Sequence, residues 1–291
     1  MAAKAGGKNS HQQLFHVSPA TSEYQYCGEQ QFLEVFDSEY HAFEEDTTGR
    51  RSQFFILSNV DEKTFSETFL SLDPDKRIFN NSSFEYISNF SLLLVKMKTA
   101  AHEQAHEAIH NLIIEKFALM NLLNRQLQMM GQVSITSNGR TKETDKTYRP
   151  RYLPQDRSTL WPTVIIESGF SEDKAKLADD ARWWLSQAGG DVKVALTISV
   201  NKNKKEITVE KWELIPRPTR NDENMKFPEV TGHIFISQQK DGPIDVTGAL
   251  LTLPFEHFFL RPANHGEGDI VLDRSDMEDI GGMIWRVHSK V

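Results

Sequence analysis

The hydrophobic and polar positions of the chain change period several times, and each period predicts an element. From Phe90 to about Leu127, apolar residues recur at helical spacing without an intervening Pro or Gly, which predicts one long amphipathic helix. Before it, the apolar pieces QFLEVF and SQFFILSNV are separated by the charged stretch EEDTTGRR. They predict a small N-terminal subdomain.

After the long helix the pattern becomes that of short strands. GQVSITSNG predicts a strand that ends in an Asn-Gly turn, DKTYRPRYLP a second strand, and PTVIIE a buried third strand. A helix capped by Ser171 then runs to the Gly189-Gly190 stop, and VKVALTISV and EITVEKWEL are two more strands. The predicted order is helix, strand, strand, strand, helix, strand, strand.

The sequence predicts four segments along the chain. Residues 1 to 22 are polar, with little periodicity, and predict a disordered tail. The subdomain then spans 23 to 90 and the central part 91 to 215. Residues 216 to 291 predict a C-terminal extension, with strands around HIFISQQ and VTGALLTL and a last helix capped by Ser275 and Glu278.

Composition narrows the class of protein. The 291 residues, 38% of them hydrophobic, suffice for one large domain or a domain with a smaller companion. The longest apolar run is too short to cross a membrane, and the start lacks a secretory core. With Cys27 as the only cysteine no internal disulfide forms, so we expect a protein of the cytoplasm or nucleus.

The net charge of −8 argues against a protein that coats nucleic acid through bulk electrostatics. A local group of basic residues can be interpreted in two ways: it lines a groove that binds phosphate, or it belongs to a charged hairpin exposed to solvent. The oligomeric state is left undetermined. The cations that would line the groove flank Asp145: Arg140, Lys142, Lys146, Arg149 and Arg151.

The most conspicuous motif is HEQAHEAIH, residues 102 to 110, which contains His-Glu-x-x-His. In zinc peptidases the two His bind the metal from one helix face and the Glu is the base, but a third ligand is needed. His110 is poorly placed for it, because it lies about 12 Å along the helix axis from His102. A later Glu on a separate helix could also be the third ligand, but Glu115 lies on the same helix as the motif. We therefore favour His residues that pack or hydrogen-bond locally on a partly exposed stripe, with a zinc peptidase as a minor alternative.

A second constellation involves acids on strands. Glu167 ends the buried run before Ser168-Gly169, and a carboxylate there is costly without a cation or several donors. Asp145, one strand upstream, is expected on the neighbouring strand. Two such carboxylates with a nearby Lys are typical of Mg²⁺-assisted phosphodiester hydrolysis.

Residues 101 to 214 resemble the PD-(D/E)XK, or restriction-endonuclease-like, nuclease superfamily, and in detail uncharacterised fungal proteins of that class. The resemblance rests on TDKTYRPRYLPQDRSTLWPTVIIESGFSE, LADDARWWL, GGDVKVALTISV and ITVEKWEL, in that order. It implies an α/β (α+β) fold whose α-β-β-β-α-β core is a mixed sheet flanked by helices. TGALLTLPFEHFFLRP is also similar to the same fungal proteins.

Residue by residue, the resemblance implies Asp145 and Glu167 as ligands of Mg²⁺ or Mn²⁺. Gly169 stands where the pattern has its Lys, so the charge would come from the following helix. Lys174 is preferred because its helix face points to the sheet, whereas Lys176 is expected to meet solvent. The family's first helix can also donate an acid, here Glu103 or Glu107.

Two functions of different classes follow. The first is a metal-dependent nuclease with Asp145, Glu167 and Lys174 as catalytic residues. The second is a catalytically inactive binding or scaffold protein that keeps the nuclease fold, which the missing strand Lys and the net acidity favour.

Overall fold

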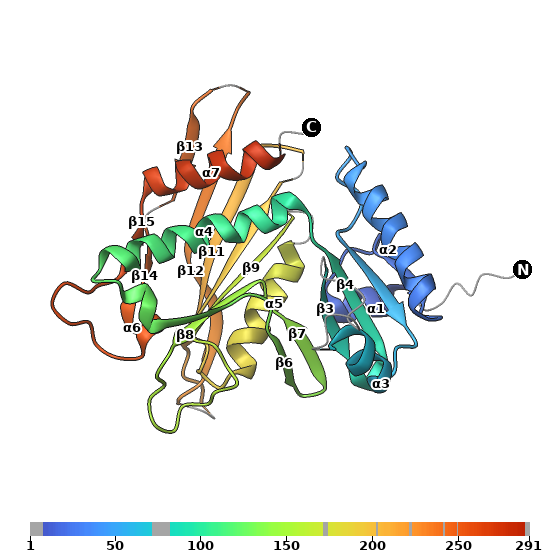
Figure 1. Cartoon of the computed structure of the whole chain (residues 1–291), viewed down its shortest axis with the longest axis horizontal. Coiled ribbons are helices and arrows are strands. Elements are labelled where there is room, and N and C mark those ends of the chain that lie inside the picture. The colour runs from blue at the N-terminus through green and yellow to red at the C-terminus, as the bar shows by residue number, and fades with distance from the viewer. Residues whose placement is uncertain are drawn as a thin grey trace, which may run out of the picture. The chain divides into compact units, whose positions relative to one another are not determined.

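The computed structural model describes residues 8–71, 82–170, 174–201, 203–220, 223–240, 242–248 and 250–288 (Figure 1). The chain forms two compact units. Unit 1 comprises Met1–Thr99 and Ser134–Glu143, and unit 2 comprises Ala100–Val133 and Thr144–Val291. Both are mixed α/β units with mixed sheets and helices, in keeping with the expected restriction-endonuclease-like class.

Unit 1 is built on a six-stranded sheet in the order β1-β2-β4-β3-β7-β6. Only β1 and β2 run parallel; the other neighbours are antiparallel. Aromatic side chains from α2, β2 and the π-helical turn η1 form much of its core, including Phe32, Phe55 and Phe69. Its elements are α1 (Lys8–Phe15), β1 (Ser22–Gln25), α2 (Glu29–Glu44), β2 (Phe54–Ser58), α3 (Glu62–Thr64), η1 (Phe65–Phe69), β3 (Ser82–Ile87), η2 (Ser88–Phe90), β4 (Leu92–Met97), β6 (Ser134–Ser137) and β7 (Arg140–Glu143).

Unit 2 is built on a seven-stranded sheet in the order β13-β12-β11-β10-β9-β8-β5. β9 and β10 are parallel, joined by the crossover helix α5, and the other neighbours are antiparallel. A two-stranded sheet of β14 and β15 completes the unit. Its strands are β5 (Leu127–Met130), β8 (Lys146–Pro150), β9 (Val164–Phe170), β10 (Val194–Val200), β11 (Glu206–Pro216), β12 (Lys226–Gln238), β13 (Ile244–Thr247), β14 (Leu251–Leu253) and β15 (Ile270–Leu272). Its helices are α4 (Ala100–Leu119), η3 (Leu123–Gln126), α5 (Lys174–Gln187), α6 (Phe255–Phe259) and α7 (Arg274–His288).

Helices cover both faces of the seven-stranded sheet. On one face, α4 lies beside α7 and packs on β9 and β10 (Figure 1). On the other face, α5 packs on β9 to β12. Consecutive side chains of a strand point to opposite faces. In β9, Ser168 therefore faces α4, and Gly169 faces Leu177 of α5.

The elements α4, β5, β8, β9, α5 and β10 form the α-β-β-β-α-β core that the resemblance implies. Its first strand differs from the prediction, because SITSNG, residues 134 to 139 of the predicted strand and turn, belongs to unit 1. Asn138 and Gly139 both have positive φ, 50° and 72°, and close a tight hairpin between β6 and β7. Since β7 also pairs with β3, this segment joins the other sheet.

Three predicted boundaries are wrong. The predicted tail of residues 1–22 contains α1 and the first residue of β1, and Phe15 is fully buried against β2 and β4 residues. Residues 1–7 lie outside the described part. The predicted helix from Phe90 to Leu127 begins with strand β4, which β-sheet pairing on both sides selects over helix. The predicted extension 216–291 supplies β12 and β13, so it continues the central sheet.

The last helix also begins one residue earlier than predicted. Asp273 Oδ1 accepts the backbone N–H of Asp276 at 3.0 Å, and Asp276 Oδ2 accepts that of Asp273 at 2.8 Å. This reciprocal cap takes the place of the Ser275 and Glu278 cap. Ser171, the predicted cap of α5, lies outside the described residues. Among the described residues, no helix has both the length and the apolarity needed to cross a membrane.

Candidate metal centre

The first two turns of α4 present two buried histidines. His102 is 1% exposed and His106 is 2% exposed, four residues apart on the face that packs on β9. Small residues at Ala101 and Ala105 bring this part of the helix close to the sheet. The ring centroids of the two imidazoles are 5.4 Å apart. The predicted partly exposed stripe is therefore wrong for these two residues.

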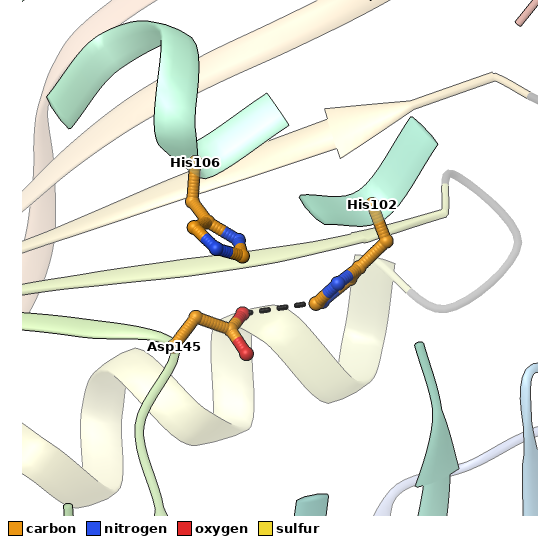
Figure 2. Close-up of side chains that lie close together, drawn as sticks. All are labelled: His102, His106 and Asp145. Carbon is orange, nitrogen blue, oxygen red and sulfur yellow. Dashed lines mark ion pairs between the residues drawn. The ribbon is translucent and has the colours of Figure 1, made fainter. Parts of the chain in front are cut away.

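Asp145 meets the two histidines from the opposite side. It directly precedes β8, is 4% exposed, and its Oδ2 lies 3.2 Å from Nε2 of His102. Both imidazole rings point from α4 toward this carboxylate (Figure 2). One ligand atom from each of the three residues lies within 4.8 Å of the others. The three side chains form what we call the His-His-Asp cluster.

Ser168 holds the cluster together from β9. Its backbone N–H donates to Asp145 Oδ2 at 2.8 Å, and its hydroxyl lies 3.1 Å from the same oxygen. The hydroxyl is also 3.0 Å from His106 Nδ1 and 3.2 Å from the His102 carbonyl oxygen. Ser168 is fully buried, so these contacts fix the carboxylate and one imidazole without competition from water.

Glu103 provides the solvent side of the cluster. Its Oε1 lies 3.3 Å from His102 Nδ1 and its Oε2 lies 3.7 Å from His106 Nε2. The Glu103 side chain is 45% exposed, unlike the buried cluster. A carboxylate on the far nitrogen of a ligating imidazole orients the ring and raises its basicity.

The donor set suits a divalent transition-metal ion. Two ligands bound tetrahedrally to Zn²⁺ at about 2.0–2.1 Å are about 3.3–3.4 Å apart, close to the 3.2 Å between His102 and Asp145. Imidazole ligands favour Zn²⁺ and similar ions, whereas Mg²⁺ prefers a shell of oxygen atoms. Two His and one carboxylate therefore fit Zn²⁺ or Mn²⁺ better than Mg²⁺.

The predicted Asp145 and Glu167 pair does not share a site. Glu167 is buried on the α5 face, where its Oε1 accepts the indole N–H of Trp184 at 2.8 Å. Ser168, the next residue, points to the α4 face with Asp145. Among the described residues, Glu167 belongs to no group of three potential metal ligands. The predicted two-carboxylate Mg²⁺ site is thus not formed, because alternation along β9 separates the acids.

The predicted Lys substitutes are also placed differently. Lys174 is exposed, and its Nζ lies 3.4 Å from Thr208 Oγ1 on β11, on the α5 face. Lys176 is 2% exposed and pairs with Asp180, so it does not meet solvent as expected. At the position of the family's Lys, Gly169 faces Leu177. No contact described for Lys174 links it to Asp145.

The cations proposed for a basic groove are engaged in contacts within their own units. In unit 1, Arg140 and Lys142 both form ion pairs with Glu85. In unit 2, Lys146 Nζ lies 2.6 Å from Glu107 Oε1. Glu107, one of the two acids of the first helix that were expected to assist the metal, is therefore engaged in an ion pair. Arg149 and Arg151 donate to Gln128 and to the Leu127 carbonyl oxygen.

His110 stands apart from the cluster, as the sequence predicted. Its Nδ1 lies 2.8 Å from the hydroxyl of buried Tyr148. Burial, and then the charge of Lys146, lowers the pKa of His110 below 6.5. Burial raises the pKa of Tyr148, so its phenol keeps the proton that a neutral imidazole accepts.

This contact predicts a pH dependence of stability. Because the folded state holds the pKa of His110 below its unfolded value of 6.5, its contribution is complete above pH 6.5 and is lost as the pH falls through the lowered pKa. In urea titrations, the difference in free energy of unfolding between the wild type and His110→Gln should shrink from pH 7.5 to pH 5.5. His265→Gln, at an exposed position, is the control. A difference that does not change with pH would contradict this account.

Sequence reasoning set aside two of the three residues that the structure brings together, His102 and His106. The spacing of His-Glu-x-x-His was the signal for them, but a third residue was sought on the same helix. Asp145 was a candidate, but it was paired with Glu167. Its true neighbours are 43 and 39 positions earlier in the chain, a separation that no local pattern reveals.

Comparisons with known proteins add little to this geometry. No protein-family model matches the sequence, and no curated protein matches it. A crystal structure described as that of "a putative nuclease belonging to DUF820" from Anabaena variabilis is similar, with a TM-score of 0.37 and 14% sequence identity. The match covers 68% of this chain and 90% of that chain.

Proposed function

We propose that this protein binds a divalent transition-metal ion at His102, His106 and Asp145 and hydrolyses phosphodiester bonds of nucleic acid. The observation that supports the proposal is the convergence of three buried ligand side chains from α4 and the start of β8. Burying an aspartate among two imidazoles is costly unless charge compensates it, and a divalent cation does so. The cluster lies at one end of the α-β-β-β-α-β core.

Each residue of the site has a distinct task. A divalent ion supplies Lewis acidity, which polarises the scissile group and makes water more acidic. His102, His106 and Asp145 hold the ion, and Ser168 keeps the Asp145 carboxylate in place. Glu103 is close to both imidazoles and half-exposed, so it can accept a proton from a water molecule that enters from solvent.

We propose phosphodiesters as the substrate class because of the α-β-β-β-α-β core. The strand and helix order agrees with the order that the resemblance to PD-(D/E)XK nucleases implies. Asp145 keeps the role that the resemblance assigned to it. Glu167 and Lys174 leave the proposed catalytic set, because they lie on the other face of the sheet. The proposed ion changes from Mg²⁺ or Mn²⁺ to Zn²⁺, with Mn²⁺ kept as the alternative.

The test is a cleavage assay of the full chain on plasmid DNA, single-stranded DNA and RNA with Zn²⁺, Mn²⁺ or Mg²⁺. We expect cleavage with Zn²⁺ or Mn²⁺ and a loss of at least about 100-fold in Asp145→Asn, since removing a metal ligand costs more than the 10- to 100-fold of an outer partner. His110→Gln, one turn beyond the site, should cleave normally. Full cleavage by Asp145→Asn would refute the assignment, and metal binding without cleavage would favour the inactive binding protein.

A metallopeptidase is the second candidate, because the structure supplies the third ligand that His102-Glu103-x-x-His106 lacked in the sequence. Two His, a carboxylate and a Glu at the second motif position are the ligands and base of several zinc peptidases. The same protein and variants should be assayed on a quenched peptide library. Peptide cleavage lost in Glu103→Gln and Asp145→Asn, with no nucleic-acid cleavage, would select the peptidase.

A further inference from the structure

A cavity of about 270 Å³ lies on the α5 face of the seven-stranded sheet, opposite the face that carries the His-His-Asp cluster. Helix α5 covers it, and strands β10, β11 and β12 form its floor. Its walls combine polar and apolar side chains. The polar residues are Lys174, Thr197, Ser199, Thr208 and Glu210, and the apolar ones are Ala175, Leu177, Ala178, Trp212 and Val230.

One end of the cavity holds hydrogen-bond donors. Ser199 is 6% exposed, and its hydroxyl has no hydrogen-bond partner within the described part of the chain. Thr208 lies directly opposite Ser199 in the pairing of β10 with β11. Lys174 Nζ is 3.4 Å from the Thr208 hydroxyl and forms no ion pair with any described residue. A buried hydroxyl without a partner is costly, so these groups point to an anionic ligand group.

The other end of the cavity holds an acceptor. Glu210 is two residues from Thr208 on β11, so the two side chains share a face and are roughly 7 Å apart along the strand. Glu210 forms no ion pair with any described residue. The Thr197 hydroxyl beside it already accepts the indole N–H of Trp212 at 3.2 Å. The carboxylate of Glu210 is therefore the group left for a cationic ligand.

The other walls of the cavity are apolar. Leu177 and Trp212 are buried, and Val230 is exposed. The small side chains of Ala175 and Ala178 leave room beneath α5. A largely apolar cavity with a few placed polar groups is the usual form of a small-molecule site. A volume of about 270 Å³ lies just below the range of about 300–1,000 Å³ for drug-sized ligands, so the cavity suits a smaller molecule.

We infer that this cavity binds a small zwitterion of the amino-acid type. Its carboxylate would meet Lys174, Ser199 and Thr208, its ammonium group Glu210, and its apolar side chain Leu177 and Trp212. The unpaired cation and anion at the two ends favour a ligand with both charges over a neutral ring or a simple anion. The site is independent of the proposed metal centre, because its residues lie on the other face of the sheet.

The test is calorimetric titration of the full chain with L-phenylalanine and L-leucine. Three comparison ligands each lack one or both charged groups of an amino acid. 3-Phenylpropanoate lacks the ammonium group, 2-phenylethylamine lacks the carboxylate, and guanosine is uncharged. We expect an amino acid to bind at least tenfold more tightly than any of the three. No binding of either amino acid at millimolar concentration, equal binding of a single-ended analogue, or tighter binding of guanosine would overturn the inference.

Variants locate the binding in the cavity. Ser199→Ala and Glu210→Gln each remove one polar group with little change in volume, and each should weaken binding at least tenfold. Ser186→Ala, on the exposed side of α5, is the matched control and should bind normally. Urea titrations confirm that each variant is folded. Unchanged affinity in both Ser199→Ala and Glu210→Gln would overturn the assignment of the ligand to this cavity.

Discussion

Replacing His106 by alanine is expected to weaken the binding of Zn²⁺ or Mn²⁺ by at least about 100-fold. Loss of an outer partner of a ligand costs about 10- to 100-fold, and loss of a ligand costs more. His106 is 2% exposed and its Nδ1 lies 3.0 Å from the Ser168 hydroxyl, so the loss of its imidazole leaves the buried part of the site one ligand short. Calorimetric titration of the metal-free protein measures the change.

His110→Ala is the matched control, because it removes the same side chain one turn further along α4, where Tyr148 is the partner. It should bind metal with wild-type affinity. A second readout is stability: metal at 100 times the wild-type Kd should raise the free energy of unfolding of the wild type by about 2.7 kcal/mol, and that of His106→Ala by no more than about 0.4 kcal/mol. Equal affinity of the wild type and His106→Ala would show that the cluster is only a hydrogen-bond network.

Trp184→Ala is expected to lower the free energy of unfolding by about 3–5 kcal/mol, the cost of removing a fully buried large side chain. The indole ring packs between α5 and the sheet beside Trp161 and Trp183. Its N–H also satisfies the buried carboxylate of Glu167. Urea denaturation followed by circular dichroism measures the loss.

Trp184→Phe separates the hydrogen bond from the packing. It keeps an aromatic ring but removes the donor to Glu167, so we expect a cost of about 1–3 kcal/mol. A double-mutant cycle with Glu167→Gln should give a coupling energy of about 0.5–3 kcal/mol between the two residues. Metal affinity should be unchanged in Glu167→Gln. A drop in affinity there would return Glu167 to the metal site and contradict its placement on the α5 face.

Much of the fold could be read from local patterns. The alternation and apolar runs of β8 to β11 and the periodicity of α5 follow from burial on one or both faces, which a short window of sequence records. The positions where helices and strands begin and end were harder to predict. β4, LLLVKM, has no period that distinguishes a fully buried strand from a buried helix, and its pairing with β2 and β3 decided the matter.

Part of the candidate site could also be predicted from local patterns. The spacing of His102 and His106 determined that they share a helix face, and the apolar run of β9 determined that Glu167 is buried. The sequence alone also singled out Asp145, which the structure buries beside His102. These conclusions need only the periods of a helix and a strand and the cost of burying charge.

Only the tertiary structure decided which of these residues meet. Alternation along β9 sends Ser168 toward α4 and Glu167 toward Trp184, so Asp145 joins the histidines of α4 and leaves the acid that the motif assigned to it. Contacts between residues about 40 positions apart depend on strand register and on which helix covers which face. Neither is encoded in a local period, so no spacing rule connects the His-Glu-x-x-His motif of α4 to Asp145, the residue before β8 that completes the cluster.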